Sequence, residues 1–392
     1  MDSLNRHRGR GLTLIQRHLQ GGSGGMVPTK AWVAVERKQK SLITLVSVIM
    51  LLAQEIQMSA TKLWVMHLNA AKSVVKPLGG IPTLWVATPP LRSLYTLLVM
   101  IDIMSTTTSP VETISFEEQI EHLESVPHYE DLQRKLLASF MPCPVPILTT
   151  ILRTNVLRAA LHHDSVVPVM TLGEAQEPSF AQFFNATLGA LLRFDPRGWA
   201  QHICDSYLSH PQPRPKVDNL MLAWAALATA YQSAAVMYLL RAVQSERLPT
   251  TLVPEATNAK CLLQEQRRKM DASIALLFKD LSEKMKATSL WRFMSWPLFI
   301  YSYELVGWSE VAAPDNGDRS EIVGIKGALP PSPGKETIAA IRKMQQLGRR
   351  LGANCIFDAV ELLEGAWKER HRKAHGKMDW DDGFAEWCVF MV

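Results

Sequence analysis

The densest group of side chains that could bind a metal or move a proton is His162-His163-Asp164, which His202 could join. Imidazole nitrogens and carboxylate oxygens are common metal ligands, and the same groups serve as general acids and bases. These three residues also fit the polar end of a helix that precedes the apolar stretch 165–169. Because the ligands of a site must converge from several elements, spacing alone favours the helix end.

A second group of titratable side chains is acidic. Glu117, Glu118, Glu121 and Glu124 follow helical spacing and so share part of one helix face. They could act as paired carboxylates, but a solvated helix face is the simpler interpretation. The chain has no GxxxxGK[ST] or GxGxxG phosphate loop and no GxSxG elbow. We therefore expect no catalytic residue, no metal ligand and no cofactor, and we predict that the chain is not an enzyme.

The cysteines favour a reduced intracellular protein. They are far apart in the sequence, odd in number and without a CxxC pair, so neither a disulfide framework nor a local zinc site is predicted. The five positions are Cys143, Cys204, Cys261, Cys355 and Cys388.

The positive charge of the chain is concentrated at its N-terminus. Residues 1–40 contain eight Lys or Arg residues and two acidic ones, a net charge of +6. Since the whole chain carries +5, the remaining 352 residues are close to neutral at −1. We expect residues 1–35 to form a basic, weakly ordered arm, which could touch DNA only through phosphate charge.

Helical periodicity dominates from Trp32 onward, and no series of strands and no fixed-period repeat is visible. The predicted helices are 42–58, 61–75, 91–104, 117–123, 129–138, 147–161, 180–194, 198–209, 219–243, 258–285, 291–306, 336–351 and 356–371. This pattern predicts an all-α fold, a single large multi-helix domain built as a non-repeat helical bundle.

Three further expectations concern particular segments. The stretch 42–58 is apolar almost all round, so it is predicted to be a central helix, and its apolar run of residues 42–53 is too short to cross a membrane. Residues 313–333 are rich in Pro, Gly, Asn and Asp and are predicted to form a mobile loop. The acidic, aromatic tail 380–392 is predicted to dock as a short helix.

Four segments along the chain form a recognisable series. They are a W-x-x-H-L-x-x-A segment, a helix with two tyrosines before an arginine, a W-P-L-F-I segment and a terminal helix with a tryptophan. The residues that carry them are Trp64, His67, Leu68 and Ala71, then Tyr231, Tyr238 and Arg241, then Trp296, Pro297 and Phe299, and finally Trp367. In this order the segments resemble the fungal-specific transcription factor domain, the helical regulatory region downstream of a binuclear zinc cluster, and the order is the strongest part of the resemblance.

The resemblance implies a nuclear regulator or co-regulator of transcription that controls a fungal metabolic or biosynthetic gene set, with residues 36–392 as its regulatory domain. Its partners would be other transcription regulators, including a zinc-cluster factor, and a small-molecule effector could bind among the helices. Full-length members begin with six clustered cysteines that hold two zinc ions. This chain has no cysteine before Cys143, so we do not expect direct, sequence-specific DNA binding from it.

The motif residues themselves are expected to be structural. Trp64 and Trp367 are large apolar anchors, and His67 is expected to be a core histidine with one hydrogen bond. Pro297 suits the first turn of a helix, where its missing N–H has no cost. Tyr301-Ser302-Tyr303 stand where the family commonly has small residues, so local packing is expected to differ there.

Three rival interpretations have distinct requirements. A helical enzyme of a biosynthetic cluster needs the 162–164 region to converge with His202 in a deep cavity. A repeat-type helical scaffold needs a fixed sequence period. Direct DNA binding needs an ordered basic surface beyond the N-terminal arm.

Overall fold

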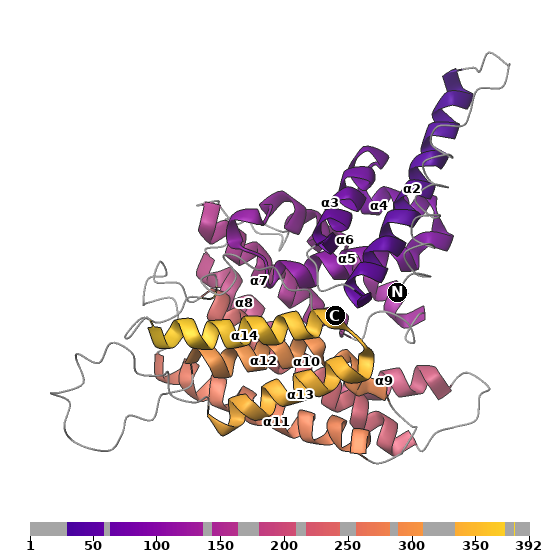
Figure 1. Cartoon of the computed structure of the whole chain (residues 1–392). Coiled ribbons are helices and arrows are strands. Elements are labelled where there is room, and N and C mark those ends of the chain that lie inside the picture. The colour runs from indigo at the N-terminus through magenta and orange to yellow at the C-terminus, as the bar shows by residue number, and fades with distance from the viewer. Residues whose placement is uncertain are drawn as a thin grey trace, which may run out of the picture. The chain divides into compact units, whose positions relative to one another are not determined.

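The computed structural model describes residues 30–58, 63–135, 143–163, 180–208, 217–243, 256–282, 289–308, 334–372 and Trp380. Every regular element in these ranges is a helix, which confirms the predicted all-α, non-repeat class (Figure 1). The helices divide into two compact units, Met1–Val99 and Met100–Val392, and the boundary falls within one helix. Each unit is therefore described by itself.

The first unit is built around a pair of packed helices, α2 and α3. Its elements are α2 (Lys30–Met58), α3 (Leu63–Val75), η1 (Lys76–Leu78), α4 (Gly80–Ala87), η2 (Pro89–Leu91) and the first half of α5 (Arg92–Thr106). Residues 30–35, which were expected in the N-terminal arm, belong to α2, and residues 1–29 lie outside the described ranges.

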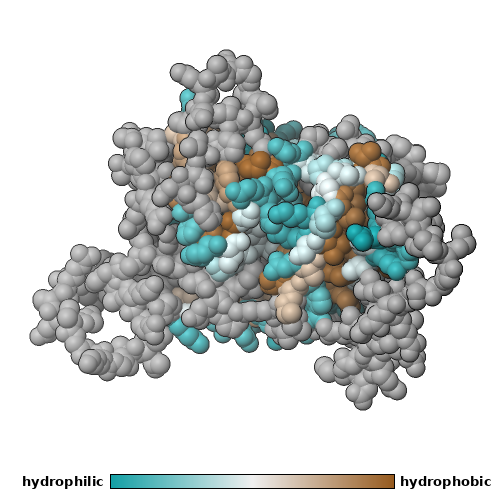
Figure 2. Space-filling model, turned by 90° about the horizontal axis from the view of Figure 1, so that it is seen from above, coloured by the Kyte–Doolittle hydropathy of each residue, from teal (hydrophilic) through white to brown (hydrophobic). Residues whose placement is uncertain are grey.

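Helix α2 is not the central helix that the sequence predicts. Leu45, Ile49 and Leu52 form one fully buried stripe, whereas Met50 is 55% exposed and Ile43 is 37% exposed. Apolar residues therefore extend round more of the helix than its neighbours bury. Figure 2 shows hydrophobic and hydrophilic side chains next to one another on one face of the molecule.

Helix α4 was not predicted, because glycine and proline between residues 77 and 82 were interpreted as a helix end followed by a loop. Gly79 and Gly80 both adopt left-handed backbone angles, with φ of 93° and 79°. Two such residues in a row turn the chain sharply, and glycine accepts them without a Cβ clash. The helix then restarts at Gly80 and buries Ile81, Leu84 and Trp85.

The second unit surrounds helix α10, which packs against α7, α8, α9, α11 and α12. After α5, the elements of this unit are η3 (Val111–Thr113), α6 (Phe116–Lys135), α7 (Val145–His163), α8 (Phe180–Arg193), α9 (Pro196–Leu208), α10 (Val217–Ala242), α11 (Ala256–Ser282), η4 (Ser289–Phe293), α12 (Ser295–Trp308), α13 (Lys335–Leu351) and α14 (Asn354–Arg372). The last three helices pack against one another, as Figure 1 shows.

Alanines explain why α10 can be central. Ala228, Ala230 and Ala234 are fully buried, and small side chains let neighbouring helices approach closely. By length and composition, Leu220–Ala242 and Glu36–Ile56 could each cross a membrane, and the bent pair Gly80–Ala87 and Pro89–Thr106 could add a third span. The α10 stretch is 78% buried within the fold, so its apolar character is accounted for by the core, whereas the α2 stretch is 22% buried.

Two helix boundaries differ from those predicted. Segments 117–123 and 129–138 form the single helix α6, which continues through Pro127 up to Lys135. Segment 291–306 divides into η4 and α12 at Met294. Pro297 is the third residue of α12, in the first turn as expected. The predicted loop 313–333 and the tail beyond Trp380 lie outside the described residues.

The end of α13 provides a test of the fold. Gly352 has φ of 65° and caps the helix through its N–H, which donates to Gly348 O. Gly352→Ala is expected to lower the free energy of unfolding by about 1 kcal/mol, because an L side chain is strained in this conformation. Gly365 lies in the exposed middle of α14 with open space around its Cα, so Gly365→Ala is expected to raise stability by about 0.5–1 kcal/mol. Urea denaturation of both variants measures these changes in the free energy of unfolding. If both substitutions changed it in the same direction, the C-terminal cap of α13 described here would be contradicted.

Candidate functional site

The motif residues of the second unit meet in a buried aromatic cluster between α10 and α12. Trp296 is fully buried and stacks on Tyr231, with ring centroids 5.9 Å apart, while Tyr238 meets it edge-on at 6.5 Å. The indole Nε1 of Trp296 donates to Thr107 Oγ1 over 3.0 Å. Because burial raises the pKa of Tyr231 well above its ordinary value, that phenol stays protonated. Aromatic side chains that are packed and hydrogen-bonded in this way hold helices together and offer no open chemistry.

Two residues outside the predicted set complete this cluster. Trp380 is buried against Tyr238 and Tyr303, with ring centroids 5.1 and 4.8 Å away. Its indole Nε1 donates to Thr107 O over 3.0 Å, and Tyr303 donates to Trp380 O over 3.2 Å. Tyr303 is one of the departures from the family pattern. Its large side chain packs against Trp380 and so holds residue 380 against α12.

A buried guanidinium holds the turn that follows α5. Arg158 on α7 is 1% exposed and donates to the carbonyl oxygens of Thr106 and Ser109, each over 2.9 Å. It also donates to Tyr238 Oη, which in turn donates to Asn155 Oδ1 over 2.7 Å. This network joins α5, α7 and α10 and satisfies carbonyl groups that burial would otherwise leave without donors.

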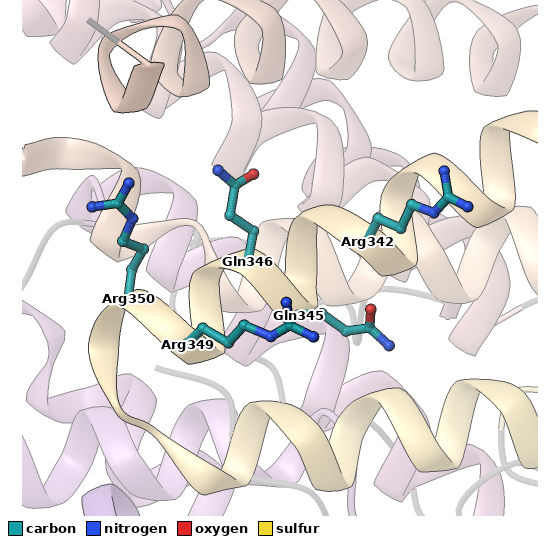
Figure 3. Close-up of a pocket in the computed structure, with 5 residues that line it drawn as sticks. All are labelled: Arg342, Gln345, Gln346, Arg349 and Arg350. Atoms are coloured by element: carbon teal, nitrogen blue, oxygen red, sulfur yellow. The ribbon is translucent and has the colours of Figure 1, made fainter.

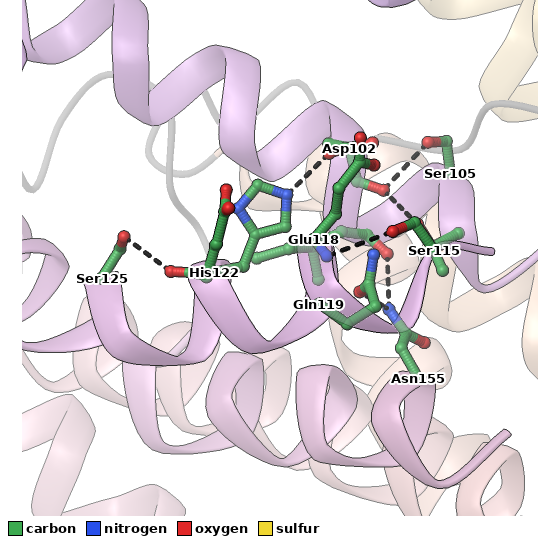
Figure 4. A network of polar contacts seen from close by, with 11 residues as sticks. Asp102, Ser105, Ser115, Glu118, Gln119, His122, Ser125 and Asn155 are labelled. Atoms are coloured by element: carbon green, nitrogen blue, oxygen red, sulfur yellow. Dashed lines mark hydrogen bonds and ion pairs between the residues drawn. The ribbon is translucent and has the colours of Figure 1, made fainter. Parts of the chain in front are cut away.

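The network continues from Asn155 to α5 and α6, as Figure 4 shows. Asn155 Nδ2 donates to Ile103 O and to Gln119 Oε1. Beside it, His122 Nε2 lies 2.6 Å from Asp102 Oδ2, with side-chain exposures of 13% and 6%. A histidine beside a carboxylate resembles part of a catalytic triad, but no hydroxyl or thiol of the described residues is hydrogen-bonded to the His122 side chain, and the pair links α5 to α6.

A second buried ionic group joins α10, α11 and α12. Glu304 is 1% exposed and accepts two hydrogen bonds from Arg241, of 2.7 and 2.9 Å, and one of 2.7 Å from Arg267. The fork-to-fork geometry with Arg241 is the strongest form of such a pair. The predicted motif residue Arg241 therefore has a structural role, and Glu304 and Arg267 were missed by the sequence analysis.

The remaining motif residues are mostly core positions. Trp64, Leu68 and Ala71 are buried on α3 in the first unit. His67, on the same helix, is half-buried, and its side chain makes no hydrogen bond within the described residues. It is therefore not the hydrogen-bonded core histidine that was expected. In the second unit, the buried motif residues Phe299 and Trp367 lie on α12 and α14.

The titratable groups that might have formed a reactive site do not come together in the described residues. His162 is half-buried at the end of α7, and His202 is exposed on α9, while Asp164 lies outside the described ranges. Of the four acidic residues on α6, Glu117, Glu121 and Glu124 are exposed and Glu118 is half-buried, so most of this face is solvated. No group of three or more His, Cys, Asp or Glu side chains within the described part of the chain could hold a metal.

The thiols of Cys143 and Cys355 are unsuited to nucleophilic attack. Cys143, Cys204, Cys261 and Cys355 are free. Burial raises the pKa of the Cys143 thiol well above its ordinary value. Burial, with the charge of Asp358 as the next cause, raises the pKa of Cys355 to about 12. A thiol with a raised pKa carries little thiolate at neutral pH and reacts slowly.

The same surroundings give Asp358 a measurable pH dependence. Burial first, and Glu361 second, raise the pKa of Asp358 from 3.8 to about 6. The folded chain therefore binds a proton more readily than the unfolded chain between about pH 4 and 6, and this group's contribution to stability falls as the pH rises through that window. Since Asp358 is half-exposed, Asp358→Asn is expected to add about 1 kcal/mol above pH 6 and nothing below pH 4. Urea denaturation at both pH values tests this, and a gain that does not vary with pH would contradict it.

A hollow on the described surface lies on the outer face of α13 (Figure 3). It encloses about 650 Å³ and is open to solvent. The side chains that line it are Arg342, Gln345, Gln346, Arg349 and Arg350. Such a set binds negative charge and hydrogen-bond acceptors, and it contains no base or nucleophile.

Sequence reasoning missed Arg158, Glu304, Trp380 and the α13 face for different reasons. A lone arginine or glutamate in an apolar helix, as at positions 158 and 304, is a weak signal that its charge is buried and paired. The basic face of α13 could have been found from the spacing of its arginines alone. Trp380 was expected only as the first residue of a docking tail, and its partners could not be predicted because they are distant in sequence.

Comparisons with known proteins agree with the motif order. The family model for the fungal specific transcription factor domain matches residues 1–391. The chain is 22% identical over 352 residues to the phomenoic acid biosynthesis cluster-specific transcriptional regulator of Leptosphaeria maculans. That alignment covers 89% of this chain and 55% of the relative, so the chain spans about half the length of the curated protein. No solved structure matches the chain significantly.

Proposed function

Because the chain belongs to the fungal specific transcription factor domain family, we propose that it regulates the transcription of a biosynthetic gene set. The observation that carries this proposal is the match of the family model over residues 1–391. The cluster-specific regulator that aligns with 89% of the chain supports the choice of biosynthetic genes.

The geometry is consistent with action through partners. The conspicuous polar groups, Arg158, Glu304 and the Asp102–His122 pair, are buried and bonded to the fold itself. What the described surface offers to another molecule is charge and shape. The proposed partners are other transcription regulators, a zinc-cluster factor among them, with a small-molecule effector as a further ligand and the nucleus as the location.

Gene deletion with transcript sequencing tests the regulatory role. In a strain that lacks this gene, we expect transcripts of a group of biosynthetic genes to change together, and the wild-type gene to restore them. An enzyme would instead leave those transcripts unchanged while its product disappeared, and that result would reject the proposal in favour of the helical enzyme.

Two variants of the rescuing gene sharpen this test. The fold-breaking variant Trp296→Ala is expected to behave like the deletion. The exposed double variant Arg193→Glu/Arg197→Glu, which lies away from every buried network described above, is expected to restore the transcripts. Restoration by both variants would show that the folded helical domain is not needed.

A further inference from the structure

We propose that the outer face of α13 binds an acidic polypeptide segment of a partner protein, with its arginines pairing the partner's carboxylates. The proposal deepens the regulatory function by naming the chemistry of a partner, and it rests on that function only for its biological meaning. The binding itself is argued from the charge, the pairing and the spacing of the side chains on this helix.

Helix α13 separates its apolar and basic residues cleanly. Thr337, Ala340, Met344, Leu347 and Gly348 are the residues that it buries. Its five cations, Lys335, Arg342, Lys343, Arg349 and Arg350, are opposed by the single carboxylate Glu336 in the first turn. The outward face is therefore strongly positive, although residues 41–392 as a whole are close to neutral.

The three arginines of this face have no partner within the described part of the chain. Arg342, Arg349 and Arg350 are exposed and make no hydrogen bond or ion pair there. By contrast, Arg158, Arg241 and Arg267 are bonded to the fold. Three unpaired guanidinium groups on one helix repel one another, so a bound anionic partner would relieve an unfavourable interaction as well as add favourable ones.

The shape and the mixed polarity of the face favour a polypeptide over a nucleic acid. Figure 3 shows Gln345 and Gln346 projecting between the arginines around the hollow. Glutamine amides both donate and accept, so they match the N–H and C=O groups of a peptide backbone, whereas phosphates only accept. A nucleic acid also requires a basic surface that spans many phosphates, whereas Arg342 and Arg349 lie only seven residues apart on one helix, about 10.5 Å.

The spacing of the arginines fits carboxylates on a partner helix. Arg342 and Arg349 are seven residues apart, which is about 10.5 Å along an α-helix. Carboxylates at positions i, i+4 and i+7 of another helix cover the same length. Guanidinium groups bind carboxylates through paired hydrogen bonds, which gives such a contact direction as well as charge.

Fluorescence anisotropy with the full chain tests the proposal. The probe is a labelled helical peptide of about 16 residues with glutamates at i, i+4 and i+7, and its control has glutamine at those three positions. We expect the glutamate peptide to bind more tightly, with an affinity that falls as salt rises. Arg342→Glu/Arg349→Glu is expected to weaken binding at least about tenfold, since each attraction becomes a repulsion.

A matched control separates this face from general charge. Arg193→Glu/Arg197→Glu makes the same charge change at exposed arginines of α8 and the start of α9 and is expected to change the affinity less than about twofold. Arg342→Lys/Arg349→Lys keeps the positive charge but loses the two-pronged guanidinium group, and this variant is expected to bind the glutamate peptide with intermediate affinity. Unchanged circular dichroism and urea midpoints would show that all three variants fold.

Several outcomes would overturn the proposal. One is equal loss of peptide binding in both glutamate double variants. Another is tighter binding of random-sequence duplex DNA than of peptide, with the same dependence on Arg342 and Arg349. A third is loss of self-association in sedimentation experiments with the Arg342→Glu/Arg349→Glu variant, which would make a second copy of this chain the occupant. Each can occur while the transcript test still succeeds, so failure here is distinguishable from failure of the regulatory function.

Discussion

Trp296→Ala is expected to lower the free energy of unfolding by about 3–5 kcal/mol, the range for removing a buried tryptophan. The side chain of Trp296 is fully buried, stacks on Tyr231 and meets Tyr238 edge-on. Its loss opens a cavity beside α10, on which most of the second unit packs. It also leaves the buried Thr107 hydroxyl without the indole donor 3.0 Å away.

Urea denaturation followed by tryptophan fluorescence and circular dichroism measures this loss. Trp296→Phe keeps a ring in the cluster and is expected to lose less than half as much stability. Trp199→Ala is the matched control, because Trp199 is half-buried and meets Trp224 edge-on with ring centroids 5.7 Å apart. If the Trp199 variant lost as much stability as the Trp296 variant, the motif tryptophan would not be the anchor described here.

Glu304→Gln is expected to lower the free energy of unfolding by about 3 kcal/mol. The substitution keeps the shape of the side chain but leaves the positive charges of Arg241 and Arg267 facing each other around a neutral group. Breaking a buried ion pair costs about 3–5 kcal/mol, and the lower end applies because these arginine side chains are 14% and 25% exposed.

A double variant separates the charge imbalance from simple loss of packing. Glu304→Leu/Arg241→Met replaces the fork with apolar groups of similar length and is expected to recover part of the stability that Glu304→Gln loses. Glu265→Gln is the control, because Glu265 pairs with Arg268 at the surface and is 37% exposed, so its loss is expected to cost less than about 1 kcal/mol. Equal losses for Glu265→Gln and Glu304→Gln would show that burial does not matter here.

These two predictions also guide how functional variants are interpreted. A substitution at Trp296 or Glu304 reduces the amount of folded protein, and with it every activity of the chain. A substitution on the outer face of α13 leaves the fold intact and is expected to change partner binding alone. Measuring abundance together with transcript levels therefore distinguishes a folding defect from a binding defect.

The sequence by itself determined the helical class and most of the helix positions. Apolar residues at helical spacing placed α7, α8, α10 and α13 to within about two residues, because that periodicity follows directly from burying one face of a helix. The order of the motif residues also indicated the family, and the motif residues Tyr231, Tyr238 and Trp296 are buried in the structure.

Local sequence was insufficient to show which of two similar apolar helices is central to its unit. Both α2 and α10 are long and apolar, yet α10 is buried within its unit while Met50 of α2 is 55% exposed. The alanines of α10 allow close neighbours on several sides, and α2 lacks such a row. Which helix becomes central depends on how many partners can approach it, and composition alone does not encode that number.

Only the tertiary structure decided which polar groups are buried and what they bind. Trp296 meets Thr107 across 189 residues of sequence, and Trp380 meets the same residue across 273. Arg158 and Glu304 have charges that sequence reasoning places at the surface, and both are held inside by donors or acceptors from other helices. A buried charge is tolerated only when distant segments supply its partners, so its position follows from the packing of the whole unit.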